Sequence, residues 1–304
     1  MKFWANCRDR FLDRCILRPS RHHLPLVDQR RVVFNRSSSS NANDSDLANV
    51  QLPSVQECFV HGDPSDRQWR EATNHEISLE QIETIRKPEV LLLKFPGTAG
   101  RGERSTPFPG NQIRKRFRQH VETWTWNPPG YGGTSGRATL RSLVPAARAW
   151  CADVTRRRAG PQTMVVYVGN SLGCLPALAI AADSPSPQCQ RAWLRNVPDL
   201  TEIVPNVASK YGLRRPMRAM VRSLPDELVA THTARRCHVP TVYLTSQLDQ
   251  LATPPTQANV QQSHAGPHHV ARLHGLAHDG LADETHEPVI EAALDWMMEP
   301  SNLE

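Results

Sequence analysis

Residues 163–182 read TMVVYVGNSLGCLPALAIAA, in which two apolar runs flank the pentapeptide 169–173, Gly-Asn-Ser-Leu-Gly. The first run is β-branched and short, which predicts a strand over 163–168, and the second repeats leucine at helical spacing, which predicts a helix over 172–182. A turn from strand to helix within so few residues forces Ser171 into a strained backbone of positive φ, and both flanking positions then need to lack a Cβ. Such a turn lifts the Ser171 hydroxyl out of the sheet, beside the amino end of the next helix. We therefore predict Ser171 as a nucleophile.

Apolar runs and amphipathic stretches alternate along the rest of the chain. This order is typical of an α/β fold, a mostly parallel central sheet with helices on both faces. We expect strands at 55–61, 90–95, 121–126, 163–168, 192–196, 241–245 and 269–273. We expect helices at 111–120, 139–159, 172–182, 200–211, 254–263 and 287–298, and a short helix or turn at 79–86.

The predicted domain organisation has two parts. Residues 1–49 are expected to form a basic N-terminal arm followed by a Ser/Asn-rich linker, because 37–49 read SSSSNANDSDLAN and cannot supply a core. Residues 50–304 are expected to form one α/β domain. Within it, about 198–240 leaves room for only a small cap. Its prolines at 198, 205, 216 and 225 break it into short helices at most.

The positive charge of the chain lies at one end. The net charge is +6, and residues 1–36 hold nine Lys and Arg against three Asp, so the remainder is neutral. The arm carries no nucleic-acid motif, so no nucleic-acid partner is expected and peripheral membrane contact through the arm is the alternative. No transmembrane segment and no secretory signal are expected, which predicts a cytoplasmic protein. The sequence indicates no oligomeric state.

Neither cysteines nor histidines form a metal-binding motif. The seven cysteines are spread without a C-x-x-C pair, which argues against a zinc ribbon or a disulfide framework. Six histidines gather between residues 264 and 286, but no H-E-x-x-H occurs and part of that segment is predicted as a strand. We expect no metal and no cofactor.

A serine nucleophile needs a base, and the base needs an acid that orients it. His278 lies in the loop GLAHDG after the last predicted strand, and Asp249 lies in SQLDQLATP after the strand at 241–245. Both follow strands at their carboxyl ends, where loops converge. Asp249 is therefore the predicted acid, and Asp199, which follows the strand at 192–196, is the alternative.

Four segments together resemble the α/β-hydrolase superfamily over about residues 88–299. FPGTAGRGE resembles the H-G-x-x-G loop after the third strand, NPPGYGGTSGR resembles the G-Y-G-x-S-x-G loop after the fourth, GNSLG resembles the nucleophile elbow, and the Asp249 and His278 loops follow in order. The loop after the fourth strand and the stretch LRNVPDLTEI are similar to a branch with small lids, the serine aminopeptidases and lysophospholipase-like esterases.

The resemblance implies a site and an activity. Ser171 would be the nucleophile, His278 the base and then the acid, and Asp249 the orienting carboxylate, with the backbone N–H groups of Leu172 and Thr98 as the oxyanion hole. Many relatives carry histidine before the loop glycine, where this chain has proline at position 96.

The expected function is that of a cofactor-independent serine hydrolase cleaving a carboxylic ester, thioester or small amide of a small acyl substrate. The alternatives are a catalytically silent scaffold that binds a partner, and an acyltransferase or serine peptidase using the same residues.

Overall fold

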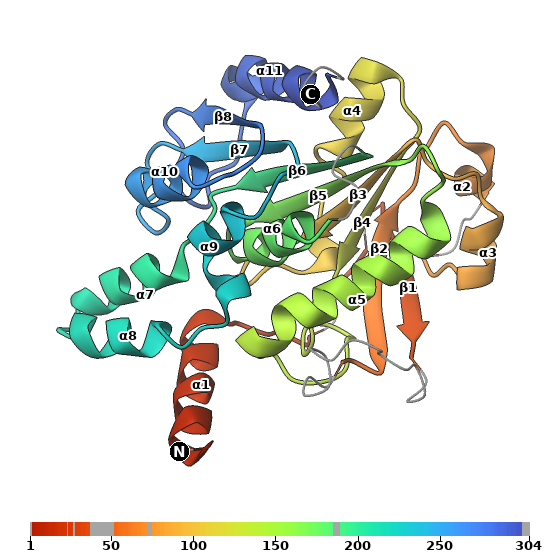
Figure 1. Cartoon of the computed structure of the whole chain (residues 1–304). Coiled ribbons are helices and arrows are strands. Elements are labelled where there is room, and N and C mark those ends of the chain that lie inside the picture. The colour runs from red at the N-terminus through yellow and green to blue at the C-terminus, as the bar shows by residue number, and fades with distance from the viewer. Residues whose placement is uncertain are drawn as a thin grey trace. The chain divides into compact units, whose positions relative to one another are not determined.

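The computed structural model describes residues 2–22, 24–26, 28–36, 52–71, 75–184 and 189–299. The chain divides into two compact units, Met1–Val165 and Val166–Glu304, coloured from red to green and from green to blue (Figure 1). The Ser/Asn-rich segment at 37–49, predicted as a linker, lies outside the described residues.

The fold class is α/β with a mostly parallel sheet, as predicted. In the first unit the strand order is β1-β2-β4-β3, with β1 and β4 antiparallel to β2 and with β3 parallel to β4. These strands are β1 (Arg30–Asn35), β2 (Val55–His61), β3 (Val90–Phe95) and β4 (Val121–Trp126).

In the second unit the strand order is β5-β6-β7-β8. The pairs β6/β7 and β7/β8 are parallel, so the carboxyl ends of these three strands share one edge of the sheet. The strands are β5 (Met164–Asn170), whose first two residues belong to the first unit, β6 (Gln190–Arg195), β7 (Thr241–Ser246) and β8 (His268–Leu273).

The helices connect these strands. The first unit contains α1 (Lys2–Ile16), α2 (Arg67–Glu71), α3 (Leu79–Thr84), α4 (Gly110–Phe117) and α5 (Leu140–Arg158). The second contains α6 (Cys174–Ala182), α7 (Leu200–Ser209), α8 (Arg214–Val221), α9 (Ala230–Ala234), α10 (Pro254–Gln262) and α11 (Glu287–Met298). Helix α9 contacts both α6 and α10 on one face of the strands, whereas α11 packs on β7 and β8. No helix in the described part of the chain is long and apolar enough to cross a membrane.

The core of the first unit is aromatic. Trp126 stacks on Trp150 of α5 with ring centroids 5.7 Å apart, and Phe95 meets both rings edge-on. All three side chains are buried, and aromatic pairs of this geometry contribute about 0.5–1.5 kcal/mol beyond the area they bury. Helix α5 is thereby fixed against β3 and β4.

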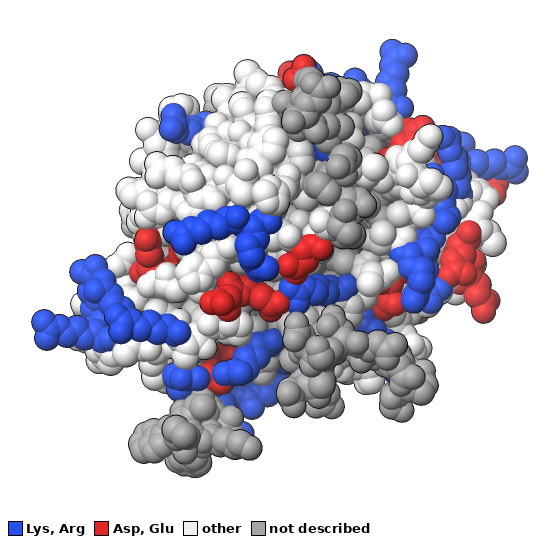
Figure 2. Space-filling model, viewed as in Figure 1, with Lys and Arg blue, Asp and Glu red and all other residues white. Residues whose placement is uncertain are grey.

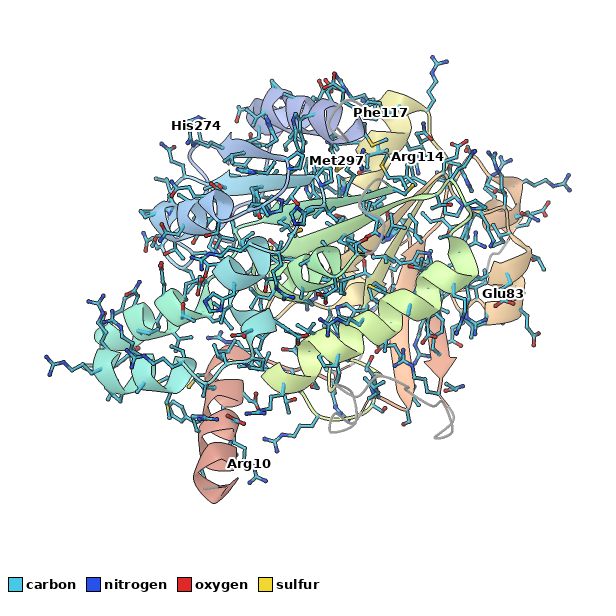
Figure 3. The ribbon with its side chains drawn as sticks, viewed as in Figure 1. Arg10, Glu83, Arg114, Phe117, His274 and Met297 are labelled. Atoms are coloured by element: carbon cyan, nitrogen blue, oxygen red, sulfur yellow. The ribbon has the colours of Figure 1, made fainter. Side chains whose placement is uncertain are left out.

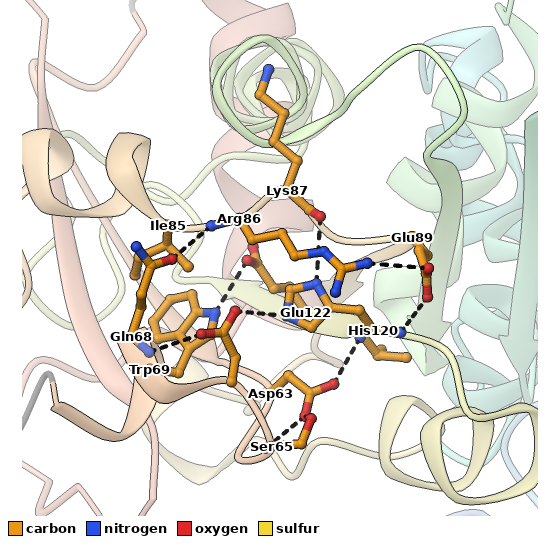
Figure 4. Close-up of polar contacts among 12 residues, drawn as sticks. Asp63, Ser65, Gln68, Trp69, Ile85, Arg86, Lys87, Glu89, His120 and Glu122 are labelled. Carbon is orange, nitrogen blue, oxygen red and sulfur yellow. Dashed lines mark hydrogen bonds and ion pairs between the residues drawn. The ribbon is translucent and has the colours of Figure 1, made fainter.

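A buried carboxylate also fixes α5. Glu122 of β4 and Arg158, the last residue of α5, form an ion pair in which both side chains are fully buried. The indole nitrogen of Trp69 donates to the same carboxylate over 3.3 Å (Figure 4), and Arg158 also donates to the backbone oxygens of Ile82 and Ile85. A buried ion pair needs such additional hydrogen bonds to offset its desolvation.

The N-terminal segment is more ordered than the predicted arm. Residues Lys2–Ile16 form α1, and Arg30–Asn35 pair with β2 as β1. The charges that suggested a surface arm are partly matched, because Arg31 forms ion pairs with Glu57 and Glu76. Within the segment predicted as a basic arm, residues Arg30–Asn35 thus form a strand that the sequence analysis did not expect.

Residues 198–240, predicted as a small cap, hold short helices. Asp199 caps α7, and α7 packs against α8 as a hairpin. Pro205 lies within α7, and the helix continues past it to Ser209 although proline cannot donate a backbone hydrogen bond.

Candidate active site

Ser171 has the backbone conformation that the sequence predicts. It follows β5 directly with φ at 51°, and the 3₁₀ helix Ser171–Gly173 leads into α6. A Cβ added to Gly169 would lie 2.6 Å from the Cα of Cys174, which is closer than side chains approach. Gly173 has φ at −64°, so its backbone angle does not require glycine. A non-glycine residue at this φ is strained, and such strain is common at functional sites.

The Ser171 hydroxyl contacts a histidine 107 residues further along the chain. The Nε2 atom of His278 lies 2.8 Å from Ser171 Oγ. His278 belongs to the loop after β8, and His274, labelled in Figure 3, is the first residue after that strand. The His278 side chain is partly buried, with 23% of its surface exposed to solvent.

Asp249 contacts the other nitrogen of this histidine. Its Oδ2 lies 2.7 Å from His278 Nδ1, and the carboxylate is fully buried. A carboxylate only accepts, so Nδ1 carries the hydrogen and Nε2 is free to accept the Ser171 proton. The backbone N–H groups of Leu251 and Ala252 donate to Asp249 Oδ1 over 2.8 and 2.9 Å. These two donors fix the position of the carboxylate.

Asp199, the alternative acid, has other partners. Its Oδ1 accepts from the backbone N–H of Thr201 at the start of α7, and its Oδ2 accepts from the Thr231 hydroxyl over 3.0 Å. The side chain is buried at the junction of α7 and α9. The structure therefore brings Asp249, and not Asp199, to His278.

Two residues at the end of β6 also contact the His278 loop. The side-chain amide of Asn196 donates to the His278 carbonyl over 2.9 Å and accepts from the Ser246 N–H over 2.9 Å. The guanidinium of Arg195 donates to the carbonyl of Gly280. Burial lowers the pKa of Arg195, and the nearby Asp249 carboxylate opposes this shift. Sequence reasoning missed both residues, although asparagine at a strand end, here with φ at 55°, tolerates positive φ.

Thr98 lies in the loop after β3, within the first unit. The Tyr131 hydroxyl donates to the Thr98 carbonyl over 2.8 Å and accepts from the Arg18 N–H over 3.1 Å. A Cβ added to Gly100 would lie 2.6 Å from the Cβ of Pro96. This loop is thus braced by Tyr131 and by close packing on Pro96. The other predicted donor, Leu172, is buried in the second unit, directly after Ser171.

Two other histidines and the cysteine next to Ser171 contact groups outside the proposed site. His264 contacts the Tyr243 hydroxyl, and His286 pairs with Asp283. Cys174 is buried beside Ser171, with its thiol on the Arg195 carbonyl, and burial raises its pKa. All seven cysteines are free. Within the described ranges, no three His, Cys, Asp or Glu side chains gather in a way that could hold a metal ion.

Comparison with solved structures supports the fold described above. No protein-family model and no curated protein sequence matches the chain. Solved structures do, among them an acetyl xylan esterase from Paenibacillus sp. R4 with TM-score 0.58 and 16% identity, which covers 97% of this chain and 94% of the esterase.

Two further solved structures agree. The esterase PF2001 of Pyrococcus furiosus has TM-score 0.58 and 10% identity over 93% of this chain and 98% of its own. The α/β hydrolase GrgF of Penicillium sp. sh18 has TM-score 0.56 and 13% identity over 90% and 98%. The chain has the fold of the α/β-hydrolase superfamily.

Proposed function

We propose that the protein is a serine hydrolase that cleaves a carboxylic ester, thioester or small amide through an acyl-enzyme on Ser171. The observation that carries the proposal is an unbroken chain of two hydrogen bonds, from Ser171 Oγ to His278 Nε2 over 2.8 Å and from His278 Nδ1 to Asp249 over 2.7 Å. These three groups supply a nucleophile, a base and an orienting charge.

The reaction follows from the direction of these bonds. His278 Nε2 takes the Ser171 proton as Oγ attacks the carbonyl carbon, and a tetrahedral adduct forms. The imidazolium then gives this proton to the leaving alkoxide, thiolate or amine, the bond to the leaving group breaks, and the acyl group stays on Ser171. Water attacks the acyl-enzyme by the same route, with His278 first as base and then as acid, and releases the carboxylic acid.

The oxyanion of the adduct needs donors. We assign this role to the backbone N–H groups of Leu172 and Thr98. The Leu172 N–H lies at the start of the helical segment after Ser171, where the dipole favours negative charge. Removal of one such donor typically lowers turnover by about 10²- to 10³-fold.

Esters are the favoured substrate class. The solved structures that this chain resembles include an acetyl xylan esterase and the Pyrococcus esterase. The lysophospholipase-like branch stays a prediction.

Hydrolysis of p-nitrophenyl acyl esters of graded chain length tests the proposal. We expect a burst of p-nitrophenol equal to the enzyme concentration, and loss of turnover in Ser171→Ala. The matched control is Ser263→Ala, which removes an exposed hydroxyl that contacts only the backbone of Asn259, and it should keep full activity. Folded protein that releases no p-nitrophenol from any of these esters, or equal turnover in Ser171→Ala, would point instead to a silent scaffold. Added alcohols that take the acyl group in place of water would indicate acyl transfer.

A further inference from the structure

The large apolar side chains that the second unit exposes all lie in segments that follow the carboxyl ends of its strands. Each follows the carboxyl end of β6, β7 or β8, in the α7–α8 hairpin or in the loops that carry Asp249 and His278. They are Val207, Tyr211, Leu213, Leu248, Leu251 and Leu281. The three strands are parallel neighbours, so these side chains belong to the same edge of the sheet. Tyr211 and Leu281 are the most exposed of these side chains, at 77% and 84%.

The same edge carries unmatched positive charge. We call residues 200–222, which contain α7 and α8, the basic hairpin. Its exposed cations are Lys210, Arg214, Arg215, Arg218 and Arg222. Residues 203–225 contain no Asp or Glu, and none of the five cations has an ion pair with a described residue. Figure 2 shows the Lys and Arg side chains projecting where Figure 1 places α7 and α8.

The fold of the basic hairpin separates its inner and outer faces. Met217 and Val221 are buried on the inner face of α8, and the arginines point outward. The turn between the helices passes through Gly212, whose φ is 71°, and presents Tyr211 and Leu213 beside the cations. The exposed apolar residues are thus additional to those that pack the hairpin.

We propose that this edge of the second unit docks on an anionic lipid surface. Lysine and arginine would contact the headgroups, and Tyr211, Leu213 and Leu281 would enter the boundary between headgroups and acyl chains. A helical surface with cations and apolar residues side by side binds lipid interfaces, and tyrosine is suited to headgroup depth. A nucleic acid would use the cations but would leave exposed leucine and valine in water. The proposal does not depend on the reaction at Ser171.

Co-sedimentation of the full chain with vesicles tests this docking. We expect binding to vesicles in which about a third of the lipid is phosphatidylserine, and weak binding to pure phosphatidylcholine. Arg214→Gln with Arg215→Gln should lower the partition coefficient by roughly 10- to 30-fold. The matched control is Arg235→Gln with Arg236→Gln, an exposed arginine pair before the amino end of β7, which should bind as the unmodified chain does.

A second pair of variants separates lipid from other polyanions. Tyr211→Ser with Leu213→Ser keeps every charge and should lower vesicle binding by about 10-fold, whereas Phe11→Ser, which alters the exposed phenylalanine of α1, should not. Equal binding to both vesicle types, or equal loss in the two arginine pairs, would overturn the proposal. So would tight binding to duplex DNA that Tyr211→Ser with Leu213→Ser leaves unchanged. Circular dichroism confirms that each variant is folded.

Discussion

The side-chain amide of Asn196 joins the His278 carbonyl to the end of β7, with 2.9 Å hydrogen bonds to His278 O and from Ser246 N. Asn196 is fully buried, and it thereby positions the loop that carries the proposed base. Ser246 lies three residues before Asp249, so one side chain holds the base and its acid in a common frame.

Asn196→Asp should lower kcat and leave KM nearly unchanged. The carboxylate can still accept from Ser246, but it faces the His278 carbonyl with a second acceptor and pushes the loop away. Displacement of a base by about 1 Å costs on the order of 10²-fold in rate. Steady-state kinetics measure this split.

Two further variants control for charge and folding. Asn206→Asp adds the same charge on the exposed face of α7 and should change neither constant. Asn196→Gly keeps the positive φ without the amide and should also lower kcat. An unchanged kcat in both Asn196 variants would remove the positioning role.

The two candidate acids give opposite predictions. Asp249→Asn should lower kcat by about 10³- to 10⁴-fold, because the amide favours the wrong tautomer of His278. Asp199→Asn should stay within a few-fold of the unmodified enzyme, since asparagine also caps helices well. A larger loss in Asp199→Asn than in Asp249→Asn would reverse the assignment.

The tight turn between β5 and α6 leaves no room for a side chain at Gly169. Gly169→Ala should destabilise the protein by about 1–3 kcal/mol and lower activity, because the new methyl group would meet the Cys174 backbone at 2.6 Å. Gly160→Ala is the matched control, as its Cβ would find only ordinary contacts, the nearest at 3.5 Å from Thr163. Urea unfolding of both variants measures the difference, and equal stabilities would contradict the account of the turn.

Burial of His264 predicts a loss of stability in acid. Its Nε2 contacts the Val239 carbonyl over 3.3 Å and its Nδ1 the Tyr243 hydroxyl over 3.0 Å. Burial, with smaller contributions from His268 and His238, lowers its pKa from 6.5 to about 4. Between these values the unfolded chain binds a proton that the folded chain does not, so the free energy of unfolding falls as the pH falls from 6.5 to 4. At pH 5 the loss is about 2 kcal/mol.

Urea unfolding at about pH 7 and about pH 5 measures this effect. His264→Gln should reduce the difference between the two free energies of unfolding, because the titrating ring is gone. Retention of the full acid dependence in His264→Gln would assign it to other groups, such as His61, whose pKa burial also lowers to about 4.

Much of the fold was predictable where the pattern is local. The strands β3 and β4 begin and end at the predicted residues, and every residue of the two except Lys94 is buried. The predicted end of α4, at residue 120, was wrong, because the helix ends at Phe117 and Arg118 adopts a left-handed conformation with φ of 55°. The strand β1 was missed because its arginines resembled a solvated arm, and its Glu57 partner lies 26 residues away.

The candidate site also contains residues that the sequence predicts and residues that only the structure reveals. Ser171, Asp249 and His278 could be named from their positions after strands, and the structure brings them within hydrogen-bond distance. The role of Asn196 could not be predicted, since its contact with His278 joins residues 82 positions apart. The contact of Tyr131 with the Thr98 loop could not be predicted for the same reason, since the two residues lie 33 positions apart.

The most direct measurement of the central claim is labelling of the folded protein with a fluorophosphonate, followed by peptide mapping by mass spectrometry. The account predicts one adduct per chain, on Ser171, which is lost in Ser171→Ala, strongly slowed in His278→Ala and unchanged in Ser263→Ala. Folded protein that stays unlabelled, or an adduct on another residue that persists in Ser171→Ala, would contradict it.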